Sequence, residues 1–172
     1  SLQHANSETG VLQNIKRASE IARNKGILFH TDAVQSVAKI PFDLKNYPVD
    51  LLSISAHKFY GPKGVGALYL RKGTPALFSP LCGGNQEKKR RGGTENVAGI
   101  MGFGKACELA NENISETSKL ADLRDYFQNR VCELIPRTEL WGDKANRLPN
   151  TLNLGFDGVA GDTLLIALDM EG

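Results

Sequence analysis

"VDLLSISAHKFYGPKGVGALYLRKG" (residues 49–73) holds two short apolar segments joined by a glycine-proline turn, with a histidine and a lysine between them. The first segment, residues 51–55, is an uncharged run rich in strand formers and predicts a buried strand. The second, "VGALYLRKG" (65–73), has an alternating pattern. Because the connection is short, we expect this strand to run antiparallel to the first.

The segments before this stretch alternate between helical and strand patterns. "VLQNIKRASEIARNKG" (11–26) carries a helical apolar stripe and ends at a glycine, directly before the strand-like "ILFHTDA" (27–33). A connection with two prolines (39–50) then leads to the strand at residues 51–55. This order predicts an α/β fold, a mostly parallel sheet with helices on both faces.

The composition changes after the sheet. "CGGNQEKKRRGGTEN" (82–96) predicts a loop, and helical spacing then predicts two long helices between residues 97 and 134. "LPNTLNLGF" (148–156) is typical of a strand, and "GDTLLIALDM" (161–170) of a helix capped by Asp162. We expect residues 1–100 to be part of a large domain, and residues 101–172 to be interdomain helices and the beginning of a small α+β domain. Both ends of the sequence look cut, so we expect a truncated chain.

Composition excludes some function classes. The 172 residues are 41% hydrophobic and 23% charged, as in an ordinary globular protein, and the formal net charge is only +2. We therefore expect neither nucleic acid nor a membrane as a partner, and no metal site. Three widely spaced cysteines, Cys82, Cys107 and Cys132, are typical of reduced thiols in a cytoplasmic protein, and we interpret them as structural or incidental.

Polar residues follow the two predicted parallel strands. Asp32 and Gln35 come just past "ILFHT" (27–31), and Ser55, His57 and Lys58 lie at and after the end of "LLSIS" (51–55). Open α/β sheets bind ligands where their strands end. A lysine in such a cleft is a candidate for a Schiff base, and an acid nearby suits a pyridinium nitrogen, which are the two groups that pyridoxal phosphate requires.

Each residue also has an ordinary structural interpretation. Lys58 alone is more often a solvated charge, Asp32 suits the cap of a helix beginning at Ala33, and His57 suits a structural role. "GPKGVG" (61–66) lacks the spacing of a phosphate-binding loop and precedes a strand. Taken singly, the residues leave these alternatives open.

Taken in order, five segments resemble one enzyme family. "HANSETGVLQ", "HTDAVQSVAKIPFDL", residues 49–73, "GGNQEKKRRGGTENVAGIMGFGKA" and "RLPNTLNLGF" resemble the cysteine desulfurases and selenocysteine lyases, pyridoxal-phosphate enzymes of the class V aminotransferase group. The resemblance covers essentially the whole chain and implies fold type I. It also implies a cytoplasmic homodimer that converts L-cysteine to L-alanine and passes sulfur, as a persulfide, to an acceptor protein of the iron–sulfur scaffold type or towards other sulfur-containing cofactors.

The resemblance assigns roles to individual positions. Lys58 would hold pyridoxal 5'-phosphate as a Schiff base and carry the substrate proton, and Asp32 would pair with the pyridine nitrogen. The other implied contacts are Gln35 to the phenolic oxygen, Ser55 and His57 to the phosphate, Thr94 to the phosphate from the neighbouring subunit, and Ser7 where the family commonly has an asparagine. The persulfide-forming cysteine is expected beyond Gly172, since none of the three cysteines aligns with it.

Other functions remain open from the sequence. A selenocysteine lyase or another class V transaminase or lyase would keep the same cofactor residues. A non-catalytic fragment or degenerate paralogue that acts as an interaction module is favoured slightly by Ser7. We expect residues 1–172 alone to be inactive.

Overall fold

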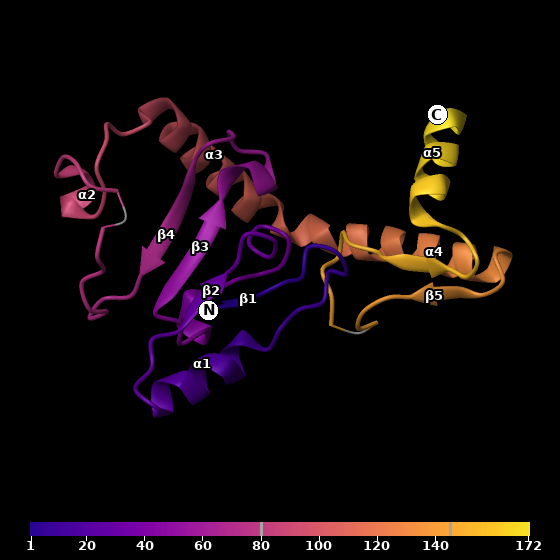
Figure 1. Cartoon of the computed structure of the whole chain (residues 1–172), viewed down its shortest axis with the longest axis horizontal. Coiled ribbons are helices and arrows are strands. Elements are labelled where there is room, and N and C mark those ends of the chain that lie inside the picture. The colour runs from indigo at the N-terminus through magenta and orange to yellow at the C-terminus, as the bar shows by residue number, and fades with distance from the viewer. Residues whose placement is uncertain (80, 145) are drawn as a thin grey trace.

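A four-stranded sheet forms the first part of the computed structural model, which describes residues 1–79, 81–144 and 146–172 (Figure 1). Its strands are β1 (Leu2–Gln3), β2 (His30–Asp32), β3 (Leu51–Ser55) and β4 (Gly66–Leu70), in this order across the sheet. The first three are parallel and β4 is antiparallel to β3. The predicted α/β class, the mostly parallel sheet and the antiparallel strand are confirmed.

The β3–β4 ladder depends on a glycine. It runs from the pair Leu51 and Leu70 to the pair Ser55 and Gly66. A Cβ atom at Gly66 would lie 2.6 Å from the carbonyl oxygen of Ile54, closer than any side chain tolerates. Glycine at this position therefore allows β4 to begin beside the end of β3.

Helix α1 (Ile15–Asn24) packs on this sheet. Its first turn is capped by Asn14, whose Oδ1 accepts a hydrogen bond of 2.9 Å from the Arg17 amide, and it ends before Gly26, where φ is +67°. Ile15 is fully buried in a cluster of apolar residues that comprises Phe29, Ala33, Val49 and Leu52. The crossover to β3 holds one 3₁₀ turn, η1 (Leu44–Asn46), and otherwise has the irregular course that its prolines predict.

Two long helices carry the chain away from the sheet (Figure 1). They are α3 (Val97–Asn113) and, after the turn η3 (Ile114–Glu116), α4 (Thr117–Leu134), so this prediction is confirmed. The predicted loop before them contains one irregular turn, α2 (Gln86–Lys89), in which Glu87 and Lys88 have positive φ. Within the described ranges, no helix is both long and apolar enough to cross a membrane.

A two-stranded antiparallel sheet follows α4. It consists of β5 (Thr138–Leu140), which the sequence did not predict, and β6 (Leu154–Phe156). Helix α5 (Gly161–Glu171) comes next. The predicted cap is wrong: Ala160 is the cap residue, and Asp162 lies in the first turn, where a carboxylate interacts favourably with the helix dipole.

The segment between β5 and β6 returns to the loop that follows β1. The Leu148 amide donates to the Gly10 carbonyl (2.8 Å), and Asn153 Nδ2 donates to the Glu8 carbonyl (3.2 Å). Arg147, whose side chain is 3% exposed, pairs with Asp125 of α4 at 3.1 Å. The loop after β1 is therefore held by residues far along the chain. The division between residues 1–100 and 101–172 stays a prediction, and α3 crosses it.

Candidate functional site

The predicted parallel strands end at the same edge of the sheet. Asp32 is the last residue of β2 and pairs in register with Ser53 of β3. Ser55 ends β3, and His57 and Lys58 follow in the 3₁₀ turn η2 (Ala56–Phe59). The side chains of Asp32, His57 and Lys58 are exposed at this edge. The sequence therefore placed these residues correctly along the strands.

Lys58 lies on a turn that is fixed by its neighbours. Ala56 and Phe59 are 0% and 5% exposed, and the ring of Phe59 packs against Phe103 of α3 with centroids 5.7 Å apart. The turn closes through a hydrogen bond of 3.0 Å from the Gly61 amide to the Ala56 carbonyl. Since buried residues stand close to Lys58 on both sides, its ammonium group is directed outwards by the packing of the turn.

A hydroxyl and an imidazole stand beside the lysine. Ser55 Oγ and His57 Nδ1 share a hydrogen bond of 2.8 Å. Together they offer a compact polar group next to Lys58 that suits an anionic oxygen. The structural interpretation of His57 stays open, since its side chain is exposed but has a hydrogen-bond partner in Ser55.

The Asp32 carboxylate is held by the chain that follows it. Its Oδ1 accepts a hydrogen bond of 2.9 Å from the Val34 amide. The Ser36 and Val37 amides both donate to the Ala33 carbonyl, so residues 33–40 form a series of turns rather than the helix that we considered. Asp32 thus accepts a hydrogen bond from the following turn, as a cap residue would, and its side chain is still exposed at the sheet edge.

Gln35 contacts a residue that the sequence did not single out. Lys39 Nζ donates to Gln35 Oε1 over 2.8 Å, and Lys39 is partly buried. Burial lowers the pKa of Lys39, and the positive charge of Lys58 lowers it further. Gln35 therefore contacts a lysine whose pKa is affected by the charge of Lys58. The spacing of four residues between Gln35 and Lys39 is a signal for such a pair.

Ser7 and Thr94 are placed differently. The Ser7 hydroxyl donates to Glu8 Oε1 (3.0 Å), and the Thr94 carbonyl accepts from Arg91 Nη2 (3.2 Å). Across the ranges that the structure covers, no hydrogen bond joins either residue to Lys58. The cofactor contacts of Ser7 and Thr94 stay predictions.

Two histidines near the sheet were also missed. His4 is 4% exposed, its Nδ1 lies 2.9 Å from Ser36 Oγ, and burial lowers its pKa. His30 Nε2 lies 2.8 Å from Ser53 Oγ. His30 lies within the predicted strand segment 27–33, whereas His4 follows the short strand β1 and has no comparable signal in the sequence. Among the described residues, no group of three or more histidine, cysteine, aspartate or glutamate side chains is placed to hold a metal ion.

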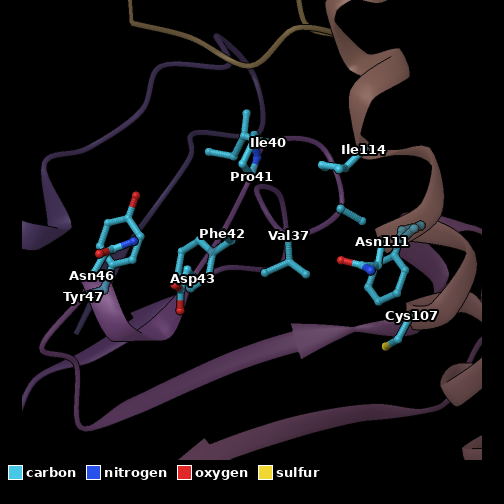
Figure 2. A pocket seen from close by; sticks show the side chains of 13 residues that line it. Val37, Ile40, Pro41, Phe42, Asp43, Asn46, Tyr47, Cys107, Asn111 and Ile114 are labelled. Carbon is cyan, nitrogen blue, oxygen red and sulfur yellow. The ribbon is translucent and has the colours of Figure 1, made fainter.

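A cavity of about 450 Å³ lies between the segment after β2 and the α3 region, and Phe59 of η2 also lines it (Figure 2). The segment from Val37 to Asp43 forms one wall, and Cys107, Asn111 and Ile114 of the α3 region form the opposite wall. None of the predicted site residues lines it. The cysteines are exposed rather than buried, contrary to the usual state of structural thiols.

The groups at the sheet edge fit pyridoxal phosphate chemically. The amine of Lys58 suits an aldehyde, and the Asp32 carboxylate on the neighbouring strand suits a protonated ring nitrogen. The Ser55 and His57 pair suits a phosphate oxygen. All of them lie where parallel strands end, which is the ligand-binding edge of α/β sheets.

Comparisons with known proteins identify the family of the chain. Residues 1–172 match the family described as Aminotransferase class-V. A protein of Dictyoglomus turgidum named Cysteine desulfurase IscS is 54% identical over 173 residues, which is 100% of this chain and 44% of that protein. The chain therefore spans less than half of this relative's length.

Two solved structures show the same fold. A structure titled NifS-like protein superposes with a TM-score of 0.92 at 40% identity, covering 99% of this chain and 48% of the other. A structure of SspA in complex with cysteine superposes with a TM-score of 0.74 at 32% identity, covering 99% and 47%. With a family match over its entire length, the chain belongs to the class V aminotransferases, a family that includes pyridoxal-phosphate enzymes.

Proposed function

We propose that this chain is part of a pyridoxal-phosphate-dependent cysteine desulfurase. The complete product of its reading frame is called the complete gene product below. It takes L-cysteine, releases L-alanine and passes the sulfur on as a persulfide. The observation that carries the proposal is Lys58, held on a packed turn at the sheet edge with Asp32 ending the neighbouring strand. The name of the Dictyoglomus relative and the cysteine bound to SspA support the substrate.

The residues of this chain have distinct tasks in that reaction. Bound pyridoxal phosphate supplies an electron sink for the α-carbon of the substrate. Lys58 would hold the cofactor through its aldehyde carbon and would move the proton at the substrate α-carbon. Asp32 keeps the proton on the ring nitrogen, and Ser55 and His57 donate hydrogen bonds to the phosphate.

We place the sulfur-accepting thiol outside residues 1–172. Cys107 lines the separate cavity, which contains none of the predicted site residues, and none of the three cysteines aligns with the persulfide-forming cysteine of the family. We further propose a cytoplasmic homodimer in which Thr94 reaches the partner's phosphate site, with an iron–sulfur scaffold protein as the sulfur acceptor. The names of the IscS relatives support the acceptor.

The test uses the complete gene product with pyridoxal phosphate. We expect a visible absorption band from the bound cofactor that Lys58→Ala abolishes, and release of alanine from L-cysteine in the presence of a thiol reductant. Lys63→Ala is the matched control, because Lys63 is an exposed lysine on the same turn region and has no assigned role. A band that survives Lys58→Ala unchanged contradicts the assignment of Lys58.

One observation favours a second candidate function. Because the Ser7 hydroxyl is engaged with Glu8, a cofactor contact at this position is weakened, which suits a non-catalytic interaction module. A complete gene product that binds no pyridoxal phosphate would support this candidate. Faster turnover of L-selenocysteine than of L-cysteine would instead indicate a selenocysteine lyase.

A further inference from the structure

The contact between Lys39 and Gln35 is unusual for a lysine. Its Nζ–Oε1 distance is 2.8 Å, and the side chain is partly buried, although lysines are mostly solvated. None of the ion pairs found among the described residues includes Lys39. The ammonium group is therefore held at this place by an amide rather than by a carboxylate.

The residue before Lys39 has a strained backbone. Ala38 has φ of +67°, a left-handed conformation that is unfavourable for a residue with a Cβ atom. The reversal occurs inside the turns that follow β2, where the chain passes from Gln35 to Lys39. A strained residue that persists next to a functional site points to a constraint on the residue beside it.

The same apolar cluster supports this turn and the turn of Lys58. Val37 and Ala38 pack against the buried cluster that contains Ala56 and Phe59 of η2. Lys39 follows Ala38, and Lys58 precedes Phe59. Both lysines therefore adjoin residues of one packed cluster, and the positive charge of Lys58 lowers the pKa of Lys39.

The chemistry of the pair fixes the orientation of the amide. A lysine ammonium group has only donors, so it must face the Oε1 end of Gln35. The Nε2 end, which has only donors, then points away from Lys39. A glutamine held in this way presents a donor, which favours an anionic oxygen on a bound ligand over a protonated one.

We propose that Lys39 is a positioning residue that holds Gln35 with its Nε2 donor towards the phenolic oxygen of bound pyridoxal phosphate. This inference rests on the proposed function. Lys39 acts on the cofactor through Gln35, and the strained Ala38 holds Lys39 in place.

The test compares variants of the complete gene product with two readouts other than turnover. These are the equilibrium affinity for pyridoxal phosphate and the ratio of the absorption bands of the bound cofactor at one fixed pH. Lys39→Met removes the donors and the charge but keeps the length of the side chain. We expect an affinity about tenfold lower and a shift of the band ratio towards the protonated phenolic oxygen.

Other variants separate positioning from general structure. Lys39→Arg keeps the donors and the charge, and we expect it to restore the wild-type band ratio. In a Gln35→Ala background, Lys39→Met should weaken binding by less than about twofold, because the residue through which it acts is gone. Lys63→Met is the matched control. If Lys39→Met does not fold, Lys39→Gln tests the same point, with a loss of about threefold expected.

The outcomes distinguish this inference from the proposed function. A wild-type protein without a cofactor band, or a band unchanged by Lys58→Ala, overturns the proposed function. The role of Lys39 alone is overturned if the cofactor band depends on Lys58 but neither Lys39→Met nor Lys39→Gln changes the cofactor affinity or the band ratio. A loss of affinity of equal size with and without Gln35 also overturns it.

Discussion

Two glycines of α3 allow a sharp test of how the Lys58 turn is held. At Gly102, a Cβ atom would lie 2.6 Å from Cγ and 3.1 Å from Cδ of Pro62, the residue after the glycine that closes the turn. At Gly104, nothing lies within 4 Å of the added atom. The same substitution, glycine to alanine, therefore meets a rigid ring at one position and open space at the other.

The expected magnitudes follow from these distances. Alanine in place of glycine within a helix gains about 1 kcal/mol, so Gly104→Ala should stabilise the protein by about that amount. At Gly102 the carbon atoms must move apart by about 1 Å to reach a normal contact, and such overpacking costs about 1–3 kcal/mol. Gly102→Ala should therefore be less stable than Gly104→Ala by about 1–3 kcal/mol.

Thermal unfolding of the complete gene product without cofactor, followed by circular dichroism, measures this difference. We expect the Tm of Gly102→Ala to lie roughly 1–4 °C below that of Gly104→Ala. Because Pro62 must shift together with the turn, only Gly102→Ala should also weaken pyridoxal-phosphate binding. If both variants are equally stable and bind the cofactor equally well, the contact between α3 and Pro62 does not fix the position of Lys58.

Three further predictions concern the core and the charges. Phe103→Ala should cost about 3 kcal/mol in urea unfolding, whereas the control Phe78→Ala, at a 90% exposed residue, should change stability by less than about 0.5 kcal/mol. Asp125→Ala leaves the buried Arg147 without its carboxylate and should cost about 2 kcal/mol, a loss that Arg147→Met in the same protein should partly reverse. Burial lowers the pKa of His4 below its ordinary value of 6.5, so the unfolded state binds more protons than the folded state below about pH 6.5. The stability contributed by His4 is therefore complete above that pH and is lost as the pH falls. In measurements of Tm against pH, His4→Gln should reduce the decrease of Tm at low pH.

Sequence patterns predicted the elements whose burial is local. Residues 51–55 have an apolar run that is buried wherever the sheet forms, and residues 97–134 have a sustained helical period, so both were predicted correctly. β5 was missed because three residues, "TEL", become a strand only through pairing with Leu154–Phe156. The cap of α5 was misassigned because an aspartate near a helix start suits both the cap and the first turn.

The candidate site was predictable to the extent that strand ends define it. Asp32, Ser55 and Lys58 follow directly from the strand pattern, since parallel strands end at one edge. Lys39 was missed because an isolated lysine in a sequence is most often solvated, and its burial arises from the strained turn at Ala38. Thr94 could not be placed from the sequence, because its predicted role depends on a second subunit.

The contacts between the loop after β1 and the segment before β6 have a consequence for synthesis on the ribosome. Asn146 and Leu12 are 134 positions apart, and Asn153 and Glu8 are 145 positions apart. At about 5–20 residues per second, the partners of this loop emerge roughly 7–29 seconds after the loop itself. The nascent chain must therefore carry the Ser7 segment without these partners while the first sheet is already complete, which makes this segment a point of exposure to chaperones and proteases.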